Sequence, residues 1–178
     1  MFMKAKNIFL TGRPRVGKTT LLKFFAEQLG ARAGGFYTEE ILGEGIRGRS
    51  GFRLITLEGK EGILAEVDVP SRYQVGRYGI HLDVMEELAV PAIKKAIIEK
   101  EWILIDEIGK MEEGSAAFKQ ILIEALNSPK QVLATIRWHD SEFTKMIKNR
   151  QDVELIKLTV PNREFVYRKI HSLILSSA

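Results

Sequence analysis

The chain has 178 residues, of which 45% are hydrophobic and 28% are charged, and its formal net charge is +4. It contains no cysteine, which excludes disulfide frameworks, zinc–thiolate sites, iron–sulfur clusters and cysteine nucleophiles. No apolar run approaches the ~20 residues of a membrane-spanning helix, and the segment Met1–Leu10 is too short for a signal peptide. We therefore expect one cytoplasmic domain over residues 1–178, without a membrane partner, whose mild positive charge suits a polyanionic ligand.

Short β-rich runs alternate with amphipathic helical patterns, which predicts an α/β fold with a mostly parallel central sheet flanked by helices. Strands of this sheet are expected over Asn7–Leu10, Trp102–Ile105, Gln131–Ile136 and Val153–Val160. Helices are expected over Thr19–Leu29, Leu82–Leu88, Pro91–Lys100, Ser115–Leu126, Ser141–Lys148 and Arg163–Leu175.

The segment from about residue 35 to residue 80 has a different pattern. Three strand-like runs follow one another there, namely Gly35–Leu42, Arg49–Leu57 and Glu61–Val67. The turn signals Gly43-Glu44-Gly45 and Glu58-Gly59-Lys60 join them. Because connections this short join antiparallel strands, we expect an antiparallel β insertion that lies on the main sheet or extends it.

A phosphate-binding pattern, GxxxxGKT, stands between the first expected strand and the first expected helix. Its glycines let the backbone curl so that successive N–H groups point inward, and the following helix adds its positive end. Lys18 is expected to reach the β- and γ-phosphates as a catalytic residue, and the Thr19 hydroxyl to coordinate Mg²⁺. The predicted phosphate-binding residues are Gly12, Arg13, Pro14, Arg15, Val16, Gly17, Lys18, Thr19 and Thr20.

Two acids, Asp106 and Glu107, end the apolar strand Trp102–Ile105 at the carboxyl edge of the sheet, where ligands bind. Asp106 is expected to hold Mg²⁺ together with Thr19. Glu107 points the other way along an extended chain, so it is expected to orient and deprotonate an attacking water. The predicted nucleotide site continues through Asp106, Glu107, Ile108, Gly109 and Lys110. Lys110 either touches phosphate or is solvated.

Arg137 follows directly on the expected strand Gln131–Ile136. It is the first candidate for a catalytic arginine that stabilises charge in the transition state of phosphoryl transfer. Thr135, at the same strand end, is a candidate sensor of the γ-phosphate. The alternative interpretation of Arg137 is an ordinary surface arginine. The alternative interpretation of Thr135 is an ordinary β-branched strand residue.

Other residues have a functional and a structural interpretation. Phe36 and Tyr78 are candidates for stacking on a nucleobase, with core packing preferred. Asn162 follows the last expected strand, where some P-loop proteins hold the base, and is interpreted as a helix N-cap. The alternating arginines Arg47, Arg49 and Arg53 could form a lid or a surface for a partner. We prefer the interpretation that they lie on a solvated face of the sheet.

Several segments resemble the small nucleoside-triphosphatase family called THEP1, and together they cover nearly the whole chain. The matching segments are Thr11–Thr20 (TGRPRVGKTT), Gly35–Glu40 (GFYTEE), Arg49–Phe52 (RSGF), Val75–Ile80 (VGRYGI), Ile105–Glu112 (IDEIGKME) and Leu158–Arg163 (LTVPNR). One position departs from the family pattern, because relatives usually have glycine where this chain has Arg15.

The resemblance implies slow, Mg²⁺-dependent hydrolysis of ATP, GTP, CTP and UTP to the diphosphate and phosphate. It also implies a P-loop fold similar to the RecA and AAA+ ATPases, with the Gln131–Ile136 strand between the P-loop strand and the Asp106 strand. When the family's roles are transferred to the matching positions, the resemblance implies that Gly12–Thr19 binds the phosphates. It also implies that Asp106 binds the metal and that Glu107 acts as the base.

Two other functions remain open at this point. A P-loop nucleotide or small-molecule kinase would need a pocket for a phosphoryl acceptor. A nucleotide-gated module would act on RNA, DNA or a protein, and nucleic acid is permitted by the charge but not favoured. The sequence carries no signal for an oligomeric state.

Overall fold

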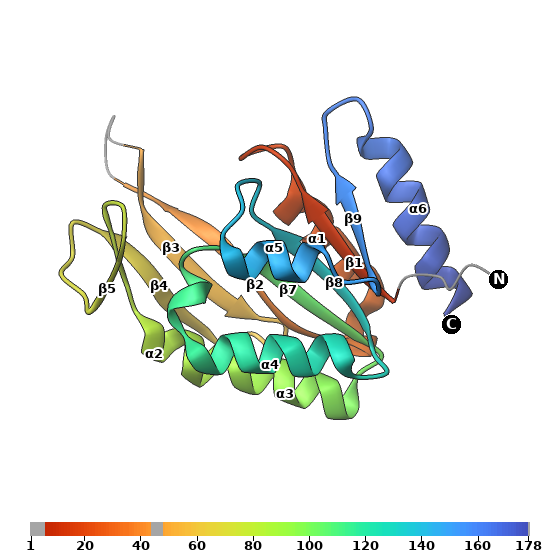
Figure 1. Cartoon of the computed structure of the whole chain (residues 1–178), viewed down its shortest axis with the longest axis horizontal. Coiled ribbons are helices and arrows are strands. Elements are labelled where there is room, and N and C mark those ends of the chain that lie inside the picture. Colours follow the sequence, from red (N-terminus) through yellow and green to blue (C-terminus); the bar gives the residue numbers. More distant parts are fainter. Residues whose placement is uncertain (1–5, 44–47, 178) are drawn as a thin grey trace.

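The computed structural model describes residues 6–43 and 48–177, which form a nine-stranded sheet with helices on both faces (Figure 1). The strand order is β5-β6-β4-β3-β2-β7-β8-β1-β9. The strands are β1 (Asn7–Thr11), β2 (Ala33–Leu42), β3 (Arg49–Thr56), β4 (Glu61–Val67), β5 (Tyr73–Val75), β6 (Tyr78–Ile80), β7 (Trp102–Ile108), β8 (Gln131–Ile136) and β9 (Val153–Lys157). The main helices are α1 (Lys18–Leu29), α2 (Leu82–Val84), α3 (Val90–Glu99), α4 (Ala116–Asn127), α5 (Glu142–Lys148) and α6 (Arg163–Ser176).

The parallel half of the sheet contains β2, β7, β8, β1 and β9. β8 lies between β1 and β7, so the P-loop strand and the strand that ends in two acids are separated by one strand. This order confirms the fold that the family resemblance implies. It also brings the carboxyl ends of all five strands to one edge of the sheet, where ligands bind in parallel α/β folds.

The antiparallel half of the sheet begins within β2. Ala33–Phe36 pair in parallel with β7, and Phe36–Leu42 pair antiparallel with β3. The expected insertion therefore extends the main sheet instead of lying on it. The hairpin of β5 and β6 was not predicted, because strands of three residues are too short to show an alternating pattern. Residues 44–47, which include part of the expected first turn and Arg47, lie outside the described residues.

Two predicted boundaries are wrong. The helices expected on either side of Pro91 form one helical segment, because a π-helical stretch, Met85–Ala89, joins α2 to α3. Pro91 is the second residue of α3, next to the π-helical stretch, and has no backbone N–H to donate there. The strand expected over Val153–Val160 ends at Lys157, four residues before Pro161.

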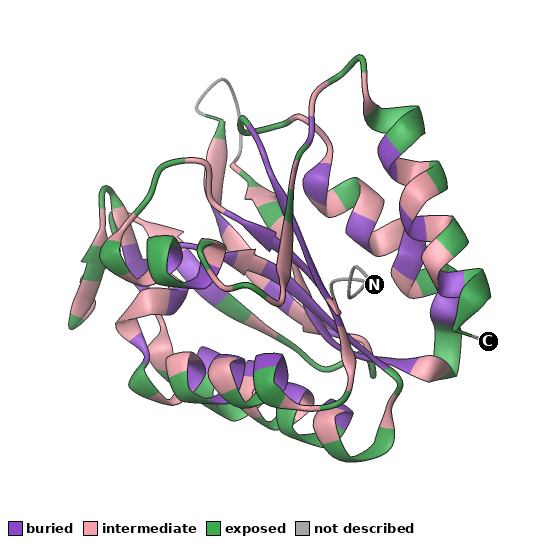
Figure 2. Cartoon of the chain, turned by 45° about the vertical axis from the view of Figure 1, so that its right-hand side comes forward, coloured by how far each residue is buried: buried purple, intermediate pink, exposed green. Residues whose placement is uncertain are grey.

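The core is divided by the sheet into two clusters of buried side chains. β1 contributes to both, because Phe9 faces the α3–α4 layer while Ile8 and Leu10 face the α1–α6 layer. Figure 2 shows the buried strands running between these two helical layers. Apolar burial on both faces explains why the central strands read as continuous hydrophobic runs.

Within residues 6–43 and 48–177, no helix combines the length and the apolar character needed to cross a membrane. The expected cytoplasmic location stays a prediction.

A close approach of β2 to β7 requires glycine at position 35. Gly35 has φ +120°, and a Cβ atom there would lie 2.0 Å from the Leu104 carbonyl oxygen. We expect Gly35→Ala to lower the free energy of unfolding by about 3 kcal/mol, since the backbone must shift. Gly59→Ala is the control, because Gly59 also has a positive φ but faces open space, and its cost is about 1 kcal/mol. Urea unfolding measures both, and equal losses would contradict the steric argument.

Candidate active site

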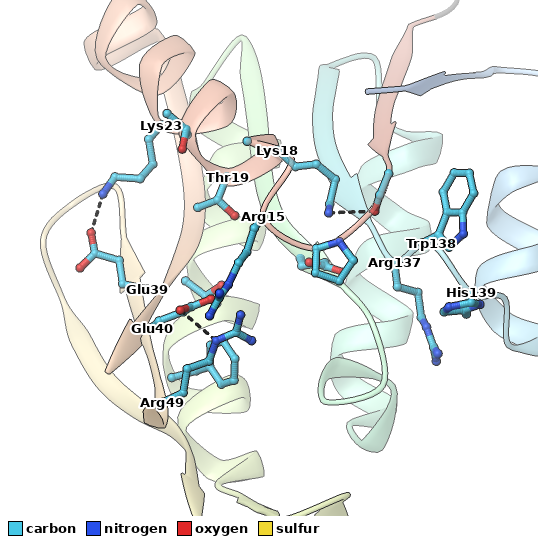
Figure 3. A pocket seen from close by; sticks show the side chains of 17 residues that line it. Arg15, Lys18, Thr19, Lys23, Glu39, Glu40, Arg49, Arg137, Trp138 and His139 are labelled. Atoms are coloured by element: carbon cyan, nitrogen blue, oxygen red, sulfur yellow. Dashed lines mark hydrogen bonds and ion pairs between the residues drawn. The ribbon is translucent and has the colours of Figure 1, made fainter. Parts of the chain in front are cut away.

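The P-loop joins the end of β1 to the start of α1, as the sequence predicts. Gly12 has φ +153°, and a Cβ atom there would lie 2.6 Å from the Leu158 carbonyl oxygen. Arg15 also adopts a left-handed conformation, with φ 63°. This conformation favours glycine, which explains the glycine expected at this position in relatives. Arg15 lines the cavity over the loop and lies on the side of Glu40 and Arg49 (Figure 3).

Lys18 is buried although it carries a charge. Its Nζ donates to the carbonyl oxygens of Gly12, at 3.1 Å, and of Arg13, at 3.3 Å. Figure 3 shows the side chain reaching across the loop toward Gly12. The ammonium group is thus held over the P-loop by the two carbonyls, in a position to exchange them for phosphate oxygens.

Asp106 lies in β7, two residues before the strand ends at Ile108, and is completely buried. Its carboxylate accepts hydrogen bonds from the hydroxyls of Thr19, at 3.0 Å, and of Thr135, at 2.5 Å. The backbone N–H and hydroxyl of Thr38 lie 3.3 Å from the same group. Burial raises the pKa of Asp106, and these hydrogen bonds act in the opposite direction. The hydroxyl of Thr135, the candidate sensor of the γ-phosphate, therefore donates its hydrogen bond to Asp106 in this structure.

Glu107 lines the cavity over the P-loop, whereas Asp106 lies beneath it. Burial raises the pKa of the Glu107 carboxyl, and the nearby Lys18 ammonium acts against this shift. Asp106 adds to the raising effect through its negative charge. Glu107 is therefore a carboxyl group with raised basicity beside the phosphate-binding loop.

Arg137 follows β8 and lines the same cavity. Its backbone is fixed, because the carbonyl oxygen accepts from Thr11 Oγ1 at 3.2 Å and from Lys148 Nζ at 2.8 Å. Its Nη1 atom is buried and has no hydrogen-bond partner among the described residues. A buried guanidinium nitrogen without a partner is costly, and an anion in the cavity would satisfy it.

The predicted continuation of the site beyond Glu107 is only partly correct. Ile108 is buried in the core and does not line the cavity over the P-loop. Gly109 and Lys110 line a neighbouring cavity instead. The cause is a sharp turn after β7, held by a hydrogen bond from the Gly109 N–H to Glu112 Oε2 at 2.9 Å.

Several cavity residues were not predicted as part of the site. They come from α1, from the β2–β3 extension and from the loop after β8, and they are Lys23, Thr38, Glu39, Glu40, Phe52, Trp138 and His139. A sequence signal existed for some of them, because they lie in the GFYTEE and RSGF segments. Phe36, by contrast, is fully buried and packs edge-on against Phe118, so the core interpretation is confirmed.

The turn after β9 supports the P-loop from the side opposite Asp106. Leu158 N–H donates to the Thr11 carbonyl at 2.7 Å, and Arg163 Nε donates to the Val16 carbonyl at 2.8 Å. Asn162 occupies the N-cap position of α6, but its side chain makes no capping hydrogen bond. It closes the turn instead, by donating to Lys157 O and accepting from Thr159 N, both at 2.8 Å.

Comparisons with known proteins agree with this geometry. Residues 7–171 match the family model described as NTPase. The chain belongs to the THEP1 family of nucleoside-triphosphatases. It is 46% identical to nucleoside-triphosphatase THEP1 of Thermotoga maritima, over 94% of this chain and 95% of the relative. It is 36% identical to the human cancer-related nucleoside-triphosphatase, over 97% and 98% of the two chains.

The fold matches a solved member of the family. The crystal structure of THEP1 from Aquifex aeolicus superposes with a TM-score of 0.84 at 41% identity, covering 94% of this chain and 98% of the other. The chain is therefore an enzyme of the nucleoside-triphosphatase class with a P-loop fold. Membership of this class also implies a divalent metal.

Arg163 tests whether the turn after β9 shapes the P-loop. We expect Arg163→Ala to weaken NTP binding about tenfold, since the loop loses a charged donor to the Val16 carbonyl. Arg168→Ala, which removes an exposed ion pair with Glu164 on the same helix, is the control. Isothermal titration with a nonhydrolysable NTP measures both, and equal affinities in the two variants would contradict the supporting role.

Proposed function

We propose that this enzyme hydrolyses ATP, GTP, CTP and UTP to the nucleoside diphosphate and phosphate in a Mg²⁺-dependent reaction. The observation that carries the proposal is the buried Asp106 carboxylate, bonded to Thr19 of the P-loop, with Glu107 beside it on the cavity wall. This arrangement supports a metal-binding pair and a proton acceptor beside one phosphate-binding loop.

The P-loop and the start of α1 bind the phosphates in this proposal. Backbone N–H groups of the loop and of the first turn of α1, such as those of Gly17, Lys18 and Thr19, donate to the phosphate oxygens, and the positive end of α1 favours their charge. Lys18 exchanges its two carbonyl partners for the β- and γ-phosphate oxygens. Thr20, in the first turn of α1, lines the cavity beside them.

The donor set at Thr19 and Asp106 suits Mg²⁺. A hydroxyl and a carboxylate are hard oxygen donors, and Mg²⁺ is usually bound by one or two carboxylates plus substrate phosphates. Among the described residues there is no cluster of three or more histidine or acidic side chains that would hold a metal without the nucleotide. When bound, Mg²⁺ would neutralise charge on the phosphates while Thr19 and Asp106 hold it in place.

Glu107 is the proposed general base. Its carboxylate accepts a proton from the water that attacks the γ-phosphorus, and the bond to the leaving diphosphate breaks. Arg137 is the proposed catalytic arginine, because its unpartnered Nη1 supplies a donor for the charge that develops on the phosphoryl oxygens. Stacking on Trp138 at the cavity wall, which tolerates different rings, is consistent with loose base selectivity.

Replacing Glu107 tests the assignment of the base. We expect Glu107→Gln to keep NTP affinity and to lose about 100-fold of turnover, since the amide cannot accept the proton. Phosphate release and equilibrium binding are the two measurements. Glu164→Gln, on the exposed face of α6, is the control for removing a carboxylate. Turnover of Glu107→Gln equal to that control would remove Glu107 from this role.

The pH dependence of turnover is a separate test. Because burial raises the pKa of Glu107 above its ordinary value of 4.5, its carboxyl stays protonated to a higher pH. A protonated carboxyl cannot accept a proton, so kcat falls as the pH drops through the raised pKa. We expect an acid limb whose midpoint lies above 4.5 in the wild type and is absent in Glu107→Gln. A limb that persists unchanged in the variant would belong to another group.

A further inference from the structure

A second cavity lies on the other side of Glu107 from the P-loop. It has a volume of about 280 Å³, and its wall includes Glu107 and Arg137 together with the apolar side chains of Phe52, Leu64 and Val75. Both Glu107 and Arg137 also line the cavity over the P-loop. The proposed base and the proposed catalytic arginine therefore stand between two spaces, one of which holds the NTP.

A third cavity, of about 650 Å³, shares Phe52, Val75 and Lys110 with the second one. It reaches the β5–β6 hairpin, where Arg77 and Tyr78 line it. We call the second and third cavities together the side groove. The side groove runs from Glu107 out to the antiparallel half of the sheet, and hydrolysis by water does not require it.

The outer part of the side groove combines aromatic rings with cationic groups. The rings of Phe52 and Tyr78 lie 5.4 Å apart between centroids, with an interplanar angle of 57°. The Arg49 guanidinium lies 5.9 Å from the centroid of the Phe52 ring, and Arg77 and Lys110 line the same space. Lys110 Nζ has no hydrogen-bond or ion-pair partner among residues 6–43 and 48–177. Rings beside cationic groups suit a planar ligand that also carries an anionic group.

The inner part of the side groove is lined by the carboxylate of Glu107, the proposed base. Glu112 also lies there, but burial raises its pKa to about 8, so it is mostly neutral at pH 7. It accepts a hydrogen bond from the Gly109 N–H and holds the turn after β7. The Tyr73 hydroxyl, on the β5–β6 hairpin, donates to the Lys110 carbonyl of the same turn at 2.6 Å. Two hydrogen bonds therefore hold the turn that forms one wall of the side groove, and the groove extends to Glu107.

Most of the family-resembling segments outside the P-loop meet in this groove. RSGF contributes Arg49 and Phe52, VGRYGI contributes Val75 to Tyr78, and IDEIGKME contributes Glu107 to Glu112 apart from Ile108. Phosphate binding and metal binding use only a small part of these segments. The side groove therefore offers a lined space beside the proposed base that the phosphates and the metal do not occupy.

We propose that the side groove binds a phosphoryl acceptor, and that the enzyme transfers the γ-phosphoryl group to a hydroxyl of a small nucleoside-like alcohol that carries an anionic group. This rests on the proposed function, because it uses the same bound NTP and Glu107. The acceptor oxygen forms a bond to the γ-phosphorus, and the bond between that phosphorus and the β–γ bridging oxygen breaks. The bonding electrons leave with the nucleoside diphosphate, and the hydroxyl proton passes to Glu107. Water in the same place gives hydrolysis.

The experiment supplies γ-labelled ATP and Mg²⁺ together with one probe at a time. The probes are adenosine, guanosine, cytidine and uridine, and their 3′-monophosphates, each with a free 5′-hydroxyl. Chromatography separates labelled 5′-phosphorylated product from labelled inorganic phosphate. We expect labelled product with at least one probe, and more of it with 3′-monophosphates than with nucleosides because of the cationic groups.

Variants of the outer groove test where the acceptor binds. We expect Tyr78→Ala to lower the ratio of labelled acceptor to labelled phosphate about tenfold, the scale of losing one stacking partner. Tyr78→Phe keeps the ring and should restore the ratio, which separates stacking from a folding defect. Arg77→Ala should lower the ratio for 3′-monophosphates only. Arg168→Ala is its matched control, because the side chains of Arg77 and Arg168 are 73% and 76% exposed and each pairs with one carboxylate.

The outcomes distinguish failure of the acceptor proposal from failure of the proposed hydrolysis. Phosphate release with no labelled acceptor from any probe would overturn the acceptor proposal and leave the proposed function intact. Absence of both phosphate release and transfer would overturn the proposed function. Transfer whose ratio to hydrolysis is the same in Tyr78→Ala, Arg77→Ala and the wild type would overturn the assignment of the side groove.

Discussion

The structure depends on one buried carboxylate. Asp106 has no contact with solvent, and removing a carboxylate from water is very costly unless hydrogen bonds compensate it. The compensation comes from Thr19 on α1, Thr38 on β2 and Thr135 on β8, while Asp106 itself lies on β7. Hydrogen bonds to a charged group contribute about 1.5–3 kcal/mol each, so these elements are stabilised in one arrangement. The same carboxylate thereby fixes the P-loop helix against the strand that supplies the proposed metal ligand and base.

The second constraint is the double role of β2. Its first residues pair in parallel with β7, and its later residues pair antiparallel with β3. Thr38 lies just past the point of change, close enough to Asp106 to bond it. A single long strand therefore joins the phosphate-binding half of the sheet to the antiparallel half. The ring of Phe52 lines a cavity together with Glu107, and Tyr78 packs against that ring, because the extension continues the same sheet and does not pack on it as a separate layer.

The parts that the sequence predicts are those encoded in consecutive residues. The P-loop, the strand that begins at Trp102 and the helix α5 all follow from local patterns. The partners of Thr135 and Asn162 could not be predicted, because each depends on a strand or turn that the local pattern does not place beside it. The two acids before Ile108 predict a place in the nucleotide site, yet Ile108 is the last residue of β7, pairs with Ile136 and lies in the core.

The curl of the P-loop is set by its neighbours as much as by its own glycines. Arg15 adopts a left-handed conformation that costs a non-glycine residue about 1–2 kcal/mol. The loop keeps this shape because Leu158 bonds to Thr11 on one side and Arg163 bonds to Val16 on the other. These contacts come from the turn after β9, which Asn162 closes. An arginine can therefore replace the glycine expected at position 15, since the conformation is imposed by the surrounding backbone.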